Sequence, residues 1–120
     1  MAHEIAAMDV PIPEVATAPT TAVSKRAYKV FSALFYDPIN DPPPGEIPWS
    51  DFLHALSSIG FAVEKQYGSA WLFTPPSSQQ RTIIFHEPHP SRNIPIRIVR
   101  RYGRRLGRAY GWTFETFGLQ

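Results

Sequence analysis

Two histidines close to a run of arginines are the residues of this chain best suited to chemistry. His86 and His89 flank a Glu-Pro pair in the string HEPHP, directly before an arginine-rich segment. A histidine titrates near neutral pH, so it can move a proton in RNA cleavage, where a 2′-hydroxyl attacks the neighbouring phosphate. Nearby arginines would stabilise the developing phosphate charge. The alternative is structural, with the imidazoles bonded to backbone or to the start of the next helix.

No other pattern indicates a catalytic centre or a cofactor. With Glu87 the two histidines make only three candidate metal ligands, too few for a typical closed site, so we expect no metal. Cys is absent, which excludes disulfides and thiolate ligands. There is no Ser/His/Asp order, glycine-rich phosphate loop or carboxylate pair. We therefore expect no cofactor, and whether the protein is an enzyme stays open.

The charge of the chain is strongly uneven. The formal net charge is only +2, yet residues 91–120 contain seven arginines against the single acid Glu115, whereas residues 1–90 contain five basic and nine acidic side chains. The seven are Arg92, Arg97, Arg100, Arg101, Arg104, Arg105 and Arg108. This asymmetry indicates a basic surface at the C-terminal end of the chain.

A helix predicted over residues 94–110 presents most of these arginines on one face. At 100° a residue, five apolar positions fall within an arc of roughly 120°, which suits a core-facing stripe: Ile98, Val99, Tyr102, Leu106 and Ala109. The arginines fill a separate arc, stacked at i,i+4 spacing although like charges repel there. Arginine binds phosphate bidentately and stacks on bases. We expect this face to meet a polyanion, RNA above all. The alternatives are a solvated or internally paired face, or an acidic protein docked with the help of Trp71 and Trp112.

The other elements follow from hydrophobic periodicity. Residues 1–22, rich in Ala, Thr and Pro, predict a disordered leader, and residues 23–45 a short helix over 24–36, capped by Ser24, with a proline-rich connector. A domain over 46–120 starts with a helix over 48–59. Strands follow over 61–67, 70–74 and 81–86 as an antiparallel meander, with a turn at Gly68-Ser69. Asn93 could cap the last helix. Its glycine line (103, 107, 111) indicates close approach of a sheet edge, another helix or a nucleic-acid backbone, and we expect packing on the sheet.

This order predicts an α+β fold of two layers, αβββα. A three-stranded antiparallel sheet would be covered on one face by helices, with an extra N-terminal helix in front. The same element order is found in the double-stranded RNA-binding domain. No apolar run is long enough to cross a membrane, and the N-terminus lacks a secretory signal, so an intracellular protein, cytoplasmic or nuclear, is expected.

Residues 46–120 resemble the HicA-like mRNA interferase toxins, in particular their fungal members. The resemblance lies in IPWSDFLHALSSIGF, KQYGSAWLFTPP, RTIIFHEPHP and GRRLGRAYGW. It implies a fold like that of the double-stranded RNA-binding domain, endoribonuclease chemistry on mRNA and an antitoxin-like partner. In the family a catalytic histidine commonly follows the Gly-Ser turn, where this chain has Ala70. The resemblance thus implies either a degenerate RNA-binding relative or an active enzyme that uses His86 or His89.

Overall fold

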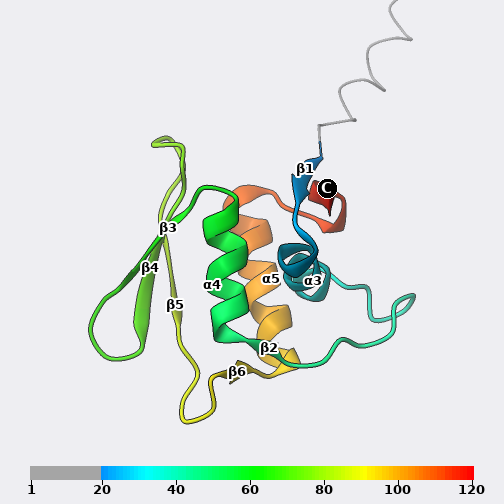
Figure 1. The fold of residues 1–120 in the computed structure, drawn as a ribbon, viewed down its shortest axis with the longest axis horizontal. Helices are drawn as coiled ribbons and strands as arrows, with labels where there is room; N and C mark the ends of the chain where they lie inside the picture. Colours follow the sequence, from blue (N-terminus) through cyan, green and yellow to red (C-terminus); the bar gives the residue numbers. More distant parts are fainter. Residues whose placement is uncertain (1–19) are drawn as a thin grey trace, which may run out of the picture.

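The computed structural model describes residues 20–120, which form three α-helices and several short strands (Figure 1). In chain order the elements are β1 (Thr21–Val23), α3 (Lys25–Leu34), β2 (Ile47–Pro48), α4 (Trp49–Ser58), β3 (Ala62–Lys65), β4 (Ala70–Thr74), β5 (Ile83–His86), β6 (Asn93–Ile94), α5 (Ile96–Tyr110), the 3-10 helix η1 (Phe114–Thr116) and β7 (Phe117–Leu119). The α+β class expected from the sequence is therefore confirmed.

The antiparallel meander is also confirmed. Strands β3, β4 and β5 form one sheet in that order, and both neighbouring pairs are antiparallel. The register places Lys65 opposite Trp71 and Trp71 opposite Phe85. Gly68 turns the chain between β3 and β4 with φ of 65°. Since side chains alternate across a strand, one face of the sheet carries Trp71, Phe73 and Phe85.

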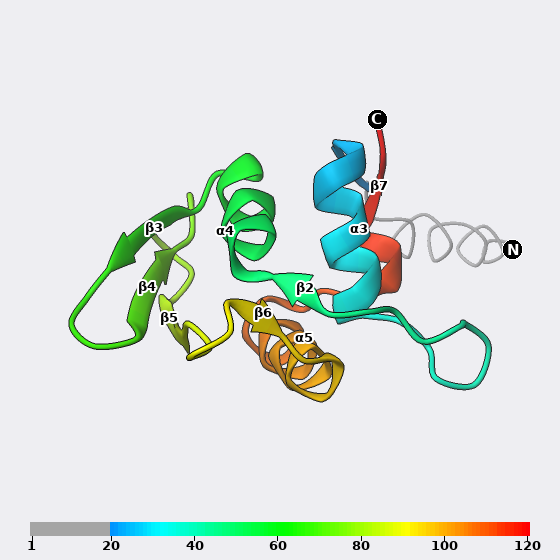
Figure 2. The same ribbon diagram turned by 60° about the horizontal axis from the view of Figure 1, so that its bottom comes forward.

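Helices α4 and α5 cover that aromatic face (Figures 1 and 2). Phe52 of α4 is fully buried, and its ring centre lies 5.5 Å from Phe73, 5.2 Å from Phe85 and 5.5 Å from Tyr102 of α5. Aromatic rings at such separations add about 0.5–1.5 kcal/mol a pair beyond their area burial. One residue thus joins both helices to both strands.

The extra N-terminal helix lies on the other side of the helix pair. Helix α3 contacts α4 and α5, and Figure 2 shows it separated from the sheet by them. Its N-terminus is capped as expected, because the Ser24 hydroxyl accepts the Ala27 amide. The arrangement has a third layer, α3 with β1 and β7, where two layers were expected.

Close contact between α3 and α5 corrects the role expected of the glycine line. A Cβ atom on Gly103 would overlap the carbonyl oxygen of Leu34, at the end of α3. Gly103 therefore lets α5 approach another helix, not the sheet. Gly111 ends α5 in the left-handed region, with φ of 75°, where glycine is favoured.

Several boundaries differ from the prediction, three of them because residues are drawn into strands or caps. Residues 21 and 22, expected in the leader, belong to β1, which pairs in parallel with β7; residues 1–19 lie outside the described residues. Pro48 is the N-cap of α4 and belongs to β2. Asn93 does not cap α5, because it lies in β6 opposite Pro48, and Pro95 is the N-cap.

Candidate polyanion-binding face

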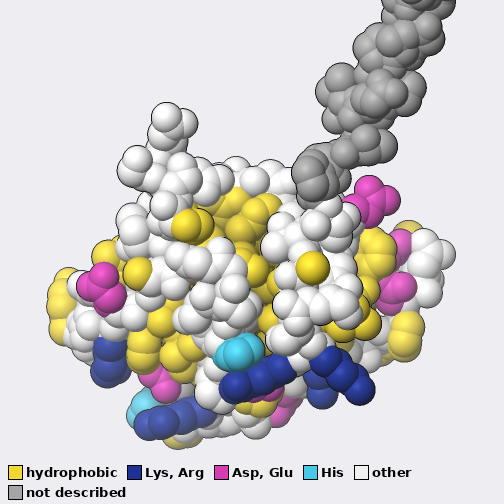
Figure 3. Space-filling view, turned by 45° about the horizontal axis from the view of Figure 1, so that its top comes forward, with side chains coloured by type: hydrophobic (Ala, Val, Ile, Leu, Met, Phe, Trp, Pro, Cys, Tyr) yellow, Lys and Arg dark blue, Asp and Glu magenta, His cyan; other side chains and the backbone are white. Residues whose placement is uncertain are grey.

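Helix α5 is oriented by its apolar stripe. Val99, Tyr102 and Leu106 are buried in the hydrophobic core, as their 100° spacing predicts, and the Tyr102 ring packs against Phe52 of α4 and Phe85 of β5. Because these residues lie on one side of the helix, the arginines on the opposite side face outward. On the face drawn in Figure 3, which does not single out α5, Lys and Arg side chains lie along the lower border and hydrophobic side chains lie above them.

Arg105 lies at the edge of the arginine arc nearest the sheet, and its side chain contacts strand β5 instead of solvent alone. Its guanidinium donates to the Ile84 carbonyl at 2.8 Å and lies 4.5 Å from the centre of the Phe85 ring. Tyr102 donates in the same way to the His86 carbonyl at 2.8 Å. Burial raises the pKa of the Tyr102 phenol, so this donor keeps its proton at neutral pH. Both side chains fasten α5 to the outer edge of β5.

Two other arginines also have partners. Arg100, on the α3 side of the arc, lies 5.5 Å from the centre of the Tyr36 ring, within range of a cation–π contact. Arg92 precedes α5 and pairs with Glu87 at 3.5 Å. Glu87 also accepts the indole N–H of Trp71 at 3.1 Å, so the acid of the HEPHP string has a structural role.

Four arginines remain, here called the arginine stripe: Arg97, Arg101, Arg104 and Arg108. All four are exposed. Their spacing of four, three and four residues places them within an arc of about 60° and along about 16 Å of the helix axis. Within residues 20–120 no carboxylate lies within 4.0 Å of any of them. Among residues 20–120 the stripe is therefore a row of positive charge that no neighbouring carboxylate neutralises.

Within residues 20–120 neither a hydrogen bond nor a shared hollow joins the two candidate histidines to the arginine stripe. His86 is exposed at the end of β5, opposite Ala70, and its Nδ1 lies 3.0 Å from the Ser69 hydroxyl. His89 lines a hollow of about 380 Å³ with Ser69 and Arg92, but neither His86 nor the stripe lines it. In the part of the chain that the structure describes, no three His, Cys, Asp or Glu residues are placed to hold a metal ion.

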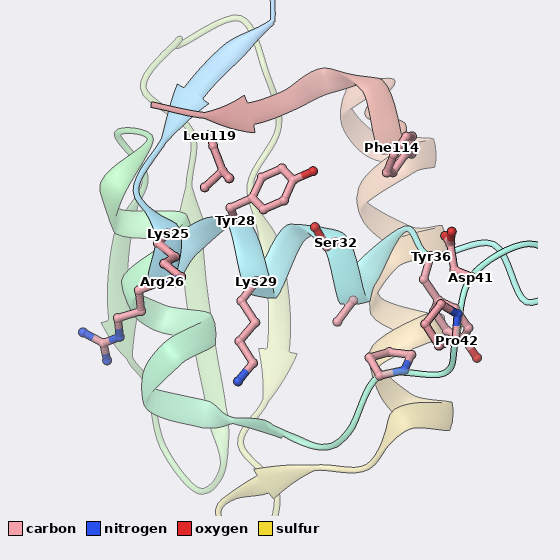
Figure 4. Close-up of a pocket in the computed structure, with 12 residues that line it drawn as sticks. Lys25, Arg26, Tyr28, Lys29, Ser32, Tyr36, Asp41, Pro42, Phe114 and Leu119 are labelled. Carbon is pink, nitrogen blue, oxygen red and sulfur yellow. The ribbon is translucent and has the colours of Figure 1, made fainter.

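Two hollows beside α3 were not predicted from the sequence. A large one, of about 850 Å³, extends along α3 between Lys25 and Tyr36 and reaches Phe114 and Leu119 (Figure 4). A smaller one, of about 320 Å³, adjoins the arginine stripe through Arg104. Both are lined by Tyr36 and Phe114, at the ends of elements distant in the chain. Phe114 is 57% accessible, an exposure that the sequence did not indicate.

The helices of residues 20–120 are too short or too polar to span a bilayer. Comparison with known proteins found no match to the chain among protein-family models, curated proteins or solved structures.

Proposed function

We propose that the protein binds RNA through the arginine stripe. The observation that carries the proposal is the row of four exposed guanidinium groups with no carboxylate near them in residues 20–120. Phosphates along an RNA backbone supply the complementary row of negative charge. Each guanidinium can hold a phosphate by two parallel hydrogen bonds.

A solvated face and an internally paired face both fit the charges of the arginine stripe less well than an external polyanion does. A solvated helix face gains stability from opposite charges at i,i+4, whereas the stripe places Arg97 four residues before Arg101 and Arg104 four before Arg108. Internal pairing within residues 20–120 is limited to Arg26 with Asp51 and Arg92 with Glu87. An external polyanion would relieve the repulsion along the stripe.

The resemblance to HicA-like proteins agrees with this proposal. Two helices on one face of a three-stranded antiparallel sheet are compatible with an arrangement like the double-stranded RNA-binding domain, which we propose for residues 46–120. Ala70 at the family's histidine position favours a binding protein that has lost the usual catalyst.

Titration of labelled RNA, followed by fluorescence anisotropy, tests the proposal on the unmodified protein. Four phosphate contacts to a single strand predict a log–log salt slope of about −3. The affinity should then fall about 50-fold between 50 and 200 mM salt. Absence of binding at 50 mM salt would refute the proposal. Capture of an acidic protein that resists nuclease treatment and is lost on charge reversal of the stripe would point to the protein-docking alternative.

An endoribonuclease that uses His86 is the second candidate. His86 lies directly opposite Ala70 in the register of β4 and β5, so it is the cross-strand neighbour of the position where the family has its histidine. The hydrogen bond between Nδ1 and Ser69 orients the ring. An exposed, oriented imidazole can serve as a general base.

Replacing His86 by alanine separates the two candidates. If His86 is the base, cleavage of a long mRNA should fall about 100-fold or more, the usual contribution of a general base. His54 is a half-buried histidine of α4 outside both candidate sites, so His54→Ala is the matched control. This variant should cleave the mRNA as fast as the unmodified protein does. Cleavage that persists when His86 and His89 are both replaced would come from a contaminating nuclease and exclude this candidate.

A further inference from the structure

The hollow beside the arginine stripe is formed by missing side chains. Gly103 and Gly107 lie one turn apart on the same side of α5, so this side of the helix carries no side chain over that turn. Gly103 is closed by the end of α3, whereas a Cβ on Gly107 would meet only the Trp112 carbonyl oxygen, at 3.2 Å. Gly107 is therefore the floor of an open hollow of about 320 Å³, at the lower end of the roughly 300–1,000 Å³ typical of ligand sites.

The walls of this hollow differ in chemistry. Two arginines line it, Arg100 and Arg104, and Arg104 belongs to the arginine stripe. Four aromatic residues line it as well: Phe35, Tyr36, Trp112 and Phe114. Trp112 is held in place by edge contacts to Phe31 and Phe61, at 6.1 and 5.7 Å between ring centres. Phe114 has no such role, because it is more than half exposed and lies outside the buried core.

We propose that this hollow accepts an unpaired base of single-stranded RNA while Arg104 and the rest of the arginine stripe hold the phosphates. The proposal rests on the RNA binding proposed above and names the class of RNA. Every base presents a flat π-face that stacks on an aromatic ring, and arginine adds a cation–π contact. A base inside a duplex is already stacked and paired on both sides, so it cannot enter without leaving the helix.

The position of Arg100 supports the same ligand. Its guanidinium lies over the Tyr36 ring at the border of the hollow, so a cation and an aromatic surface are already adjacent there. A nucleotide carries both complementary groups, a flat base and a charged phosphate, a short distance apart. An acidic peptide would satisfy the arginines and leave the exposed Phe114 ring unused.

The experiment compares three labelled RNA oligomers of equal length: a single strand without self-complementarity, the same strand in a duplex, and an abasic strand that keeps only sugar and phosphate. The unmodified protein should bind the single strand about tenfold more tightly than the abasic strand, since stacking of one base contributes about that factor. Phe114→Ala should remove this preference and leave abasic binding unchanged. Phe114→Trp should restore it.

Tyr67→Ala is the matched control, because Tyr67 is 89% exposed in the turn between β3 and β4. Phe114→Leu keeps an apolar side chain without a ring and serves if the alanine variant folds poorly. Equal binding of the single strand by the Phe114 and Tyr67 variants would overturn the base site, as would equal affinity of the unmodified protein for single and abasic strands. Either result leaves salt-dependent phosphate binding intact, whereas no binding to any oligomer refutes RNA binding as a whole.

Discussion

Replacing all four residues of the arginine stripe by alanine should lower the affinity for RNA at least about a hundredfold at 50 mM salt. The reason is the loss of four phosphate contacts, each of which contributes about 0.7 to the salt slope on a single strand. The magnitude of the log–log salt slope should fall from about 3 toward zero. Anisotropy titrations at four or more salt concentrations measure both quantities. The fold should survive, since the four side chains are exposed.

A double variant provides a control of equal charge. Arg101→Ala with Arg104→Ala and Lys25→Ala with Lys29→Ala each remove two exposed positive charges, but the second pair lies on α3. If RNA responds only to net charge, the two variants will weaken binding equally, and the stripe is then not the binding face. If the stripe is the site, only the first pair should reduce the salt slope, by about 1.4.

Gly103→Ala should be the most damaging single change to stability. The new methyl group would overlap the backbone carbonyl of Leu34, and neither partner is a flexible side chain, so α3 or α5 must move. Overpacking of this kind costs about 3 kcal/mol. For a domain of this size the melting temperature should fall by about 15 °C, measured by circular dichroism.

Two other glycines calibrate that result. Gly45→Ala meets no atom within 4 Å, so its free energy of unfolding should change by less than about 0.5 kcal/mol. Gly107→Ala places a methyl group 3.2 Å from the Trp112 carbonyl, and this tight contact opposes a gain of about 1 kcal/mol in helix propensity. If Gly103→Ala melts like Gly45→Ala, the contact between α3 and α5 is looser than described.

Patterns within one element were predicted well from the sequence. The aromatic run after the Gly68-Ser69 turn located β4 at its observed bounds, and the 100° spacing of residues in α5 placed Val99, Tyr102 and Leu106 in the core. Ser24 was correctly predicted to cap α3, because its hydroxyl binds an amide only three residues along the chain. Such features depend on residues a few positions apart, and their chemistry can be read directly.

Features that join distant segments were missed. β1 pairs with β7 across almost the whole described chain, and Asn93 is drawn from the helix cap into a bridge with Pro48. The arginines looked equivalent in sequence. Only the positions of β5 and α3 distinguish Arg105 and Arg100, which have partners, from the stripe, which has none within residues 20–120.

The side chains that fasten α5 to β5 also limit how copies of this protein can assemble. Tyr102, Arg105 and Tyr110 donate to the carbonyls of His86, Ile84 and Arg81, so the outer edge of β5 offers few free acceptors to an incoming strand. Edge-to-edge pairing of the three-stranded sheet is therefore directed to β3 rather than to β5. Two molecules joined through β3 would leave β5 at both ends of the joined sheet, where the side chains of α5 obstruct the addition of another strand.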